Sequence, residues 1–375
     1  VYICFLSMNF TPNLSNMLTQ QGFVITGDEP HYLLMSKALL SGKIDGDSIY
    51  ENLGGTFRHI HDATGVLFYG LQVSNHPYGM SLLSAIPYLL GQVILGSGAY
   101  GVLIFMCAMM ALNSVIIYKI SMFLTKEDLG VSILTSTAFS FATIMFMWSG
   151  QFFTENFMST FILFAIYKFM VAKTNIDWVL GAVSLGFLPF VKYQMIFVVG
   201  VCLFVFGILY LRGRKETKYS IVVLSSSIIA YLIYLYTFIG VGNITMLGST
   251  YVSDATRVIN VFGYYINRTF YNAFFGLFLD RNYGLLIYSP ILILSALGIV
   301  QAYKNRNVGM YIGATIFVSW IGAISCFTSW MGWITIPGKY IVVVAPLLCI
   351  PFALGLKDFK NNKYYICGFL GLFLA

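Results

Sequence analysis

The residues of this chain that could do chemistry are concentrated in one short polar stretch. Residues 27–32 place two adjacent carboxylates, Asp28 and Glu29, beside His31 and Tyr32, although only 9% of the chain is charged. A carboxylate in such a loop can act as a general base that takes a proton from a hydroxyl group. Because Asp28 directly precedes a helical pattern, it is also a candidate N-cap residue, and the sequence leaves both interpretations open.

Single ionisable residues stand at the borders of apolar segments farther along the chain. They are, in chain order, His76, Glu155, Lys192, Arg281 and Lys339, and Tyr340 follows the last of them. A substrate with a lipid tail and a phosphate fits this set, because cations bind the phosphate and a carboxylate activates an acceptor hydroxyl. A phosphate can leave without a general acid, so one base and charge stabilisation suffice. The alternative is structural: Glu155 then stabilises a helix N-terminus, and the basic side chains extend toward lipid headgroups.

Metal and redox chemistry receive little support from the sequence. His59 and His61 stand one residue apart and hint at a metal ligand pair, but loop histidines are more often hydrogen-bonding residues. A site with two carboxylates is compatible with a divalent metal, and nothing in the spacing specifies one. The six cysteines lie in apolar segments without CxxC or Cys/His spacing, which predicts small buried apolar residues.

The elements that must position these residues are membrane helices. Hydrophobic residues make up 58% of the chain, and apolar runs of about 20 residues, long enough to cross a membrane as helices, recur along it. This pattern predicts an all-α polytopic membrane protein with about eleven transmembrane helices. The apolar segments are 79–96, 101–124, 130–148, 154–172, 177–191, 193–211, 219–240, 284–303, 308–327, 339–356 and 364 onward. A short amphipathic helix is predicted at 30–40, capped by Asp28 and ended by Ser41 and Gly42.

The distribution of basic residues predicts which side of the membrane each loop faces. If segment 79–96 lies in the membrane plane, 13 of the 21 Lys and Arg residues fall in loops opposite Asp28. If it crosses the membrane, the acidic first loop joins the basic loops, which the positive-inside rule disfavours. We therefore predict an in-plane helix and place the polar loops on the non-cytoplasmic face. These loops are 11–100, 149–153, 241–283 and 328–338, with an interfacial helix in the third, at 261–279. The formal charge of +7 resides in short loops between spans and does not indicate nucleic-acid binding.

The chain is predicted to form a single transmembrane domain over residues 1–375. The first external loop, 11–100, should carry juxtamembrane helices. The apolar runs at 1–10 and 364–375 are each too short to span a membrane. We expect both ends of the sequence to lack part of a helix.

Five stretches of the chain together resemble the GT-C glycosyltransferases. They are Gly27-Asp28-Glu29-Pro30-His31-Tyr32, Asn75-His76-Pro77-Tyr78-Gly79, Thr154-Glu155-Asn156, Gly284-Leu-Leu-Ile-Tyr-Ser-Pro290, and Trp330-Met-Gly-Trp333 with Pro337-Gly338-Lys339-Tyr340 and Pro346. Within the superfamily, the order is most similar to protein O-mannosyltransferases and to the lipid A aminoarabinose transferase. The resemblance covers residues 27 to about 350, and it also implies that the helix after His76 lies on the outer surface.

The resemblance implies a reaction and roles for the residues. A hexose or pentose would pass from a polyprenyl-phosphate donor to an acceptor hydroxyl on a protein, lipid or glycan, with inversion at the anomeric carbon. The reaction would take place on the non-cytoplasmic face of the plasma membrane in a prokaryote, or of the endoplasmic reticulum in a eukaryote. Asp28 would be the general base, and Glu155 would orient the acceptor or sugar. The other substrate-binding residues would be Glu29, His31, Tyr32, His76, Lys192, Arg281, Lys339 and Tyr340.

Three positions depart from the family pattern. Tyr78 stands where the family usually has a second proline. Lys339 replaces an arginine, which keeps the charge but loses the bidentate fork. His31 replaces the arginine of the aminoarabinose transferase, which would make phosphate binding at this position depend on pH.

Two other classes of protein fit the composition. A transporter or flippase for lipid-linked sugars would also be polytopic, but such proteins tend to place polar residues at the membrane midplane. Here the predicted spans are nearly free of charge and the polar residues gather on one face, which favours an enzyme. The third class is a non-catalytic membrane subunit or a lipid-glycan polymerase of another helical family.

Overall fold

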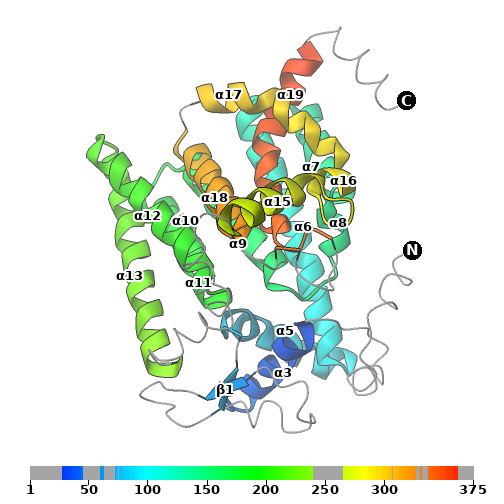
Figure 1. The fold of residues 1–375 in the computed structure, drawn as a ribbon, viewed down its shortest axis with the longest axis vertical. Helices are drawn as coiled ribbons and strands as arrows, with labels where there is room; N and C mark the ends of the chain where they lie inside the picture. Colours follow the sequence, from blue (N-terminus) through cyan, green and yellow to red (C-terminus); the bar gives the residue numbers. More distant parts are fainter. Residues whose placement is uncertain are drawn as a thin grey trace.

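The computed structural model of the chain describes residues 28–44, 60–62, 72–74, 76–239, 265–305, 307–326, 330–331 and 337–361. This part is almost entirely helical, as Figure 1 shows. Its one sheet is a pair of short antiparallel strands, β1 (Ile60–Asp62) and β2 (Gln72–Ser74). The prediction of an all-α fold is confirmed, with this small ribbon as an addition that the sequence did not indicate.

Among the described residues, the first half of the bundle contains nine α-helices. They are α3 (Glu29–Leu40), α5 (Gly79–Leu95), α6 (Gly98–Thr125), α7 (Leu129–Phe141), α8 (Ile144–Trp148), α9 (Thr154–Val171), α10 (Asn175–Gly186), α11 (Leu188–Val191) and α12 (Met195–Leu211) among the described residues. The second half mixes α-helices with tighter turns. It comprises η2 (Lys215–Thr217), α13 (Lys218–Tyr234), the π-helix η3 (Leu235–Ile239), α15 (Tyr265–Leu279), α16 (Leu285–Tyr288), η4 (Pro290–Gly298), α17 (Ile299–Lys304), α18 (Val308–Ser325), η5 (Ile341–Val343), η6 (Ala345–Leu348) and α19 (Cys349–Asn361).

Three helices in the described residues are long and apolar enough to cross a membrane: Gly98–Thr125, Lys215–Thr237 and Val308–Ser325. Shorter apolar helices accompany them over Gly79–Leu95, Leu129–Phe141, Asn175–Val191, Met195–Leu211, Phe270–Leu279 and Pro290–Lys304. The chain is therefore an integral membrane protein. Its sidedness, its division into loops and an in-plane position of α5 stay predictions.

Four segments that the sequence predicted as continuous helices are interrupted. Segment 130–148 divides into α7 and α8, segment 177–191 divides into α10 and α11, and segments 284–303 and 339–356 contain 3-10 helices. In 284–303, α16 ends at Tyr288 and the 3-10 helix η4 begins at Pro290. Proline lacks a backbone N–H and disfavours helical dihedrals in the residue before it, here Ser289 with φ −143°. In 339–356, η5 and η6 precede α19 and Pro346 lies in η6. By contrast, α15 runs without interruption through the polar pair Asn267–Arg268.

Helices α3 and α5 lie together at one end of the bundle (Figure 1). α3 was predicted to be amphipathic, but it is buried on most of its circumference because α5 covers it. Buried hydroxyls join the two helices: Ser36 and Ser84 share a hydrogen bond of 2.9 Å, and Ser81 Oγ donates to Tyr32 O at 3.1 Å. α5 in turn approaches α11 closely at Gly79, where a Cβ atom would overlap the backbone of Phe190. The N-terminus of α3 is thus held firmly against the bundle.

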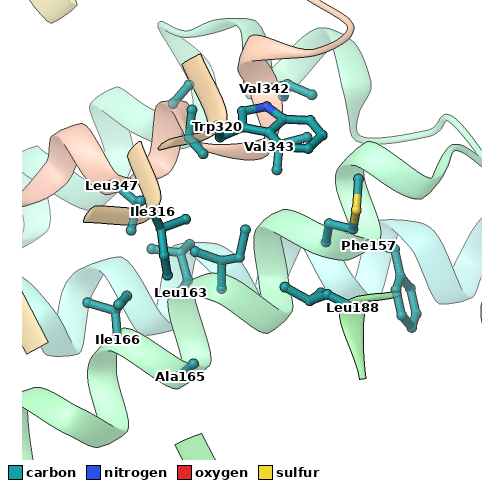
Figure 2. Close-up of a cluster of buried hydrophobic side chains, with 14 of the residues drawn as sticks. Phe157, Leu163, Ala165, Ile166, Leu188, Ile316, Trp320, Val342, Val343 and Leu347 are labelled. Atoms are coloured by element: carbon teal, nitrogen blue, oxygen red, sulfur yellow. The ribbon is translucent and has the colours of Figure 1, made fainter. Parts of the chain in front are cut away.

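The hydrophobic core lies where α9, α18 and the η5–η6 segment meet (Figure 2). Leu163, Ile316, Trp320 and Val342 are fully buried there. Trp320 Nε1 also donates a 2.7 Å hydrogen bond to Tyr340 O. This core therefore fixes the backbone that directly follows Lys339.

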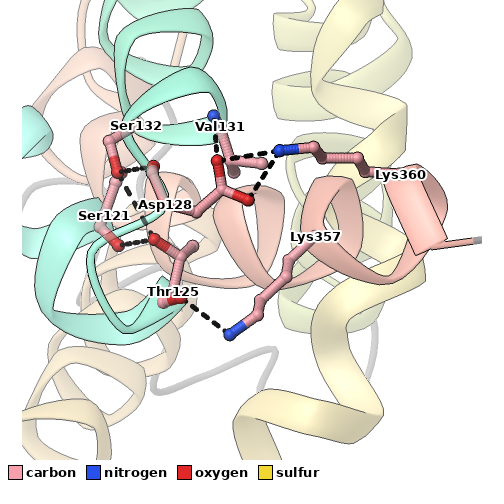
Figure 3. Close-up of polar contacts among 7 residues, drawn as sticks. All are labelled: Ser121, Thr125, Asp128, Val131, Ser132, Lys357 and Lys360. Carbon is pink, nitrogen blue, oxygen red and sulfur yellow. Dashed lines mark hydrogen bonds and ion pairs between the residues drawn. The ribbon is translucent and has the colours of Figure 1, made fainter.

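A second group of polar contacts lies at the end of the bundle opposite α3 (Figures 1 and 3). Asp128 caps α7 by accepting from Val131 N at 3.1 Å, and Lys360 on α19 pairs with the same carboxylate at 2.9 Å. Lys357 donates to Thr125 O at 2.7 Å. We call this group the α19 brace, because it ties α19 to the junction between α6 and α7.

The cysteines differ in part from the prediction. Cys202 and Cys349 are buried, as expected of small apolar residues. Cys107 and Cys326 are exposed on the surface of apolar helices, so burial was the wrong prediction for these two. Cys4 and Cys367 lie outside the described residues.

Candidate active site

Asp28 occupies the N-cap position of α3 but does not cap it. Its backbone is helical, with φ −83° and ψ −10°, and its side chain makes no capping hydrogen bond. The carboxylate instead pairs with the ammonium of Lys339, with Oδ2 and Nζ 3.2 Å apart. The structural interpretation of Asp28 as a helix cap is therefore wrong. The pair joins two segments separated by 311 residues, which local helix stability does not require.

Glu155 forms a second ion pair with Lys192. It lies in the first turn of α9 and is fully buried, and its Oε2 accepts a 2.9 Å hydrogen bond from Thr154 Oγ1. Its Oε1 contacts the ammonium of Lys192, the residue that ends α11. A carboxylate that only stabilised a helix N-terminus would need no such partner. Glu155 is a buried acid with a dedicated cation.

The two ion pairs form one charge cluster around Tyr340. The ammonium of Lys192 lies 5.0 Å from the centre of the Tyr340 ring, and that of Lys339 lies 6.0 Å from it. Lys339 also lies 5.1 Å from the centre of the Phe153 ring and is only 8% exposed. The structural alternative had these lysines extend toward lipid headgroups, but both ammonium groups instead pair with carboxylates of the protein. The formal charges of the two carboxylates and the two ammonium groups cancel within this cluster.

The electrostatic environment of Asp28 keeps its carboxyl group ionised. Burial raises the pKa of Asp28, but the positive charges of Lys339, His76 and Lys192 lower it more. The result is a pKa well below the usual range of an aspartate. Asp28 therefore carries a negative charge at every pH in which the protein would normally work.

His31, Tyr32 and His76 form the wall of the cluster beside α3. The imidazole rings of His31 and His76 stack with centres 5.3 Å apart, and the Tyr32 hydroxyl lies 3.4 Å from His76 Nδ1. His76 is positioned just before α5 by a hydrogen bond from its backbone N–H to Ser74 Oγ, at 3.1 Å. The Tyr32 ring contacts Phe152 edge to face. The structure thus brings together the residues that the sequence placed in the first loop.

Glu29 has a different environment from its neighbour Asp28. It is 4% exposed, and its Oε1 accepts a 2.6 Å hydrogen bond from the backbone N–H of Phe152. This contact ties the start of α3 to the segment that leads into α9. Glu29 acts as a connector between two parts of the site.

Arg281 lies apart from the cluster. It is exposed in the turn between α15 and α16, and it forms no ion pair with a carboxylate in the described part of the chain. His59 is outside the described residues, and the side chain of His61 is outside them too. Among the described side chains, no three His, Cys, Asp or Glu residues are grouped so that they could hold a metal ion. The described side chains therefore do not fit a metal centre.

Sequence reasoning missed Trp148 and Asn156, two buried residues that position the cluster. Trp148 Nε1 donates a 2.9 Å hydrogen bond to Pro337 O, two residues before Lys339. Asn156 Nδ2 donates to Trp148 O, which fixes the turn between α8 and α9. Neither residue carries a charge: Trp148 lies inside an apolar segment, and Asn156 entered the sequence analysis only as the neighbour of Glu155 in the Thr154-Glu155-Asn156 motif.

Comparison with solved structures reveals the fold. No family model and no curated protein matches this sequence. The oligosaccharyltransferase of Archaeoglobus fulgidus, solved in complex with Zn and sulfate, matches with a TM-score of 0.55 and 13% identity, over 93% of this chain and 47% of that one. ArnT from Cupriavidus metallidurans, bound to undecaprenyl phosphate, matches with a TM-score of 0.50 and 13% identity, over 88% of this chain and 56% of that one. This chain has the GT-C fold.

The GT-C fold confirms the resemblance that the sequence motifs indicated. The apo form of the same ArnT covers 98% of this chain and 60% of its own, at 14% identity and a TM-score of 0.50. The chain thus spans about half the length of the solved GT-C structures that it matches. At this level of identity the likeness concerns the fold, and the roles of individual residues are matters of proposal.

Proposed function

We propose that this chain is a membrane glycosyltransferase that moves a sugar from a polyprenyl-phosphate donor to an acceptor hydroxyl. The observation that carries this proposal is the charge cluster, in which an ionised Asp28 and two buried lysines meet at one end of a GT-C bundle. A solved structure of the same fold is bound to undecaprenyl phosphate, which supports a lipid phosphate as the donor group. The acceptor is a hydroxyl group of a protein, lipid or glycan.

The bonds change as follows. The acceptor oxygen attacks the anomeric carbon, and its proton passes to the carboxylate of Asp28. The bond between the anomeric carbon and the phosphate oxygen breaks, and the polyprenyl phosphate leaves with the electron pair. A single displacement of this kind inverts the anomeric configuration. Because Glu29 is buried and accepts from Phe152 N, whereas the Asp28 side chain is partly exposed, we assign the role of base to Asp28.

The lysines stabilise the charge that develops on the leaving phosphate. The ammonium groups of Lys192 and Lys339 lie 5.0 Å and 6.0 Å from the centre of the Tyr340 ring, and on this proposal both bind the donor phosphate. Preorganised cations in a site shielded from water stabilise such a charge more strongly than they would in water. Glu155 holds Lys192 in place and orients the acceptor or sugar. His76 completes the donor site on this proposal, and Arg281, which lies apart from the cluster, is not assigned to it.

The reaction is proposed for the non-cytoplasmic face of the membrane. The support is the distribution of Lys and Arg, most of which lie in the loops opposite Asp28. Lys357 and Lys360 are part of that basic side, and the structure has them at the opposite end of the bundle from α3.

The first prediction concerns Asp28→Asn, which removes the proposed base but keeps the shape of the side chain. Transfer of radiolabelled sugar from a polyprenyl-phosphate donor should fall about 10²-fold or more in the purified variant. Asp128→Asn is the matched control, because it breaks an aspartate–lysine pair at the other end of the bundle. Unchanged turnover in the folded Asp28→Asn protein would end the proposed role of this residue. Mass spectrometry of lipids that co-purify with the protein would identify the donor.

A further inference from the structure

The proposed base is occupied in the structure. Asp28 Oδ2 lies 3.2 Å from Lys339 Nζ, so the carboxylate that should accept a proton is already paired with an ammonium. The same ammonium is one of the two cations that should hold the donor phosphate. One lysine thus has two anionic partners in the proposed reaction, and it serves them at different stages.

We propose that the donor phosphate displaces Asp28 from Lys339, so that binding of the donor releases the base. The proposal rests on the proposed function, since it names how the same site is switched on. Before the donor binds, Asp28 is held by Lys339. Once the phosphate is in place, Lys339 pairs with a phosphate oxygen and Asp28 faces the acceptor hydroxyl.

The exchange is expected at Lys339 because the two ion pairs differ in burial. The side chain of Glu155 is fully buried, and Lys192 is kept with it by the cost of leaving that charge unpaired. The side chain of Asp28 is 29% exposed, so its carboxylate can be hydrated when the ammonium leaves. Asp28 is therefore the carboxylate that can give up its partner.

The exchange also agrees with the chemistry of the two anions. The phosphate of a polyprenyl-phosphate sugar is a diester whose two non-bridging oxygens share one negative charge, so it can replace the Asp28 carboxylate as the anionic partner of Lys339. Loss of Lys339 removes a positive charge that lowers the pKa of Asp28. The carboxylate consequently becomes a stronger base only after the donor is bound.

Binding of polyprenyl phosphate, the donor without its sugar, tests the exchange directly. We expect Asp28→Asn to bind it about tenfold more tightly than wild type, because Lys339 no longer has to leave a carboxylate. Lys339→Gln should bind it more weakly. In the double variant, Asp28→Asn should add little, since the lysine for which the two anions compete is gone. A double-mutant cycle over the four proteins gives the coupling between the two residues.

The outcomes separate the two proposals. If wild-type protein binds polyprenyl phosphate and Asp28→Asn tightens binding equally with and without Lys339, simple repulsion explains the effect and the exchange is wrong. If wild-type protein does not bind polyprenyl phosphate at all, the proposed function is wrong. Asp128→Asn should leave binding unchanged, and thermal melting of each variant confirms that it is folded. Asp28→Ser serves as the second variant if Asp28→Asn does not fold.

Discussion

At the residue scale, the different surroundings of Asp28 and Glu29 give the two carboxylates different roles. The two carboxylates are adjacent in the chain, yet one faces an ammonium from a distant segment and the other accepts from a backbone N–H. The first is available to a substrate that competes for the ammonium. The second is committed to the position of the loop before α9. Their order along the helix start decides which acid reaches the cluster.

The low pKa of Asp28 has a consequence for stability. Its folded pKa lies below the ordinary value of 3.8, so its contribution to stability is fully present above about pH 4 and is lost as pH falls through the folded pKa. The difference in melting temperature between wild type and Asp28→Asn should therefore stay constant from pH 5 to 8 and shrink under more acidic conditions. A difference that disappears between pH 6 and 8 would contradict the assigned charge state.

Glu29 can be tested by a conservative substitution. Glu29→Gln keeps an oxygen that accepts from Phe152 N, so we expect turnover within about threefold of wild type, whereas Glu29→Ala leaves a buried N–H unsatisfied at a cost of about 1–3 kcal/mol. Turnover and thermal melting of both variants provide the measurement. Loss of turnover in a stable Glu29→Gln protein would show that its charge takes part in the reaction.

At the element scale, the cluster depends on how the start of α3 and the segment before η5 are anchored. α3 is buried against α5, and Lys339 is followed by a 3-10 helix whose backbone packs in the core. Hydrophobic runs in the sequence predicted where helices lie, because a helix that is buried in lipid or protein requires apolar side chains. They did not predict the 3-10 turns of η5 or the contact from Trp148 to Pro337 O, because a single N–H to carbonyl contact leaves no periodic signal.

Trp148 should affect donor binding through the position of Lys339. Trp148→Phe keeps an aromatic ring but leaves Pro337 O without its donor, at a cost of about 1–3 kcal/mol in stability. We expect KM for the donor to rise more than kcat falls, because the misplaced group is a phosphate ligand. Trp178→Phe is the control: Trp178 is also buried, and it packs on Phe169 and Phe206. A rise in KM in both variants would point to general loosening of the fold.

At the scale of the whole molecule, the two ends of the bundle carry different groups of polar residues. The charge cluster occupies the end with α3 and α5, and the α19 brace occupies the other. The sequence predicted Asp28, Glu155, Lys192 and Lys339 as site residues, and the structure pairs Asp28 with Lys339 and Glu155 with Lys192. Arg281 was predicted as a site residue on the same kind of sequence evidence. Its exposure could not be foreseen, because it depends on the direction in which the turn after α15 leaves the bundle.

The sidedness of these two ends can be measured by cysteine labelling. Residues 92 and 215 are both exposed and are predicted to lie on opposite sides of the membrane. All six native cysteines should first be replaced by serine, so that only the introduced thiol reacts. We expect a membrane-impermeant reagent to label Gln92→Cys in intact cells and Lys215→Cys only after the membrane is opened. Labelling of both from the same side would overturn the predicted topology.

The α19 brace limits how the exchange of partners at Lys339 can take place. Lys360 and Lys357 fasten α19 to the turn between α6 and α7, and η5 and η6 connect that helix to Lys339. A sliding motion of the whole segment would have to break these contacts at its far end. The backbone at Lys339 is therefore held in place. The ammonium group must pass from the carboxylate to the phosphate through movement of the lysine side chain alone, along its four methylene groups.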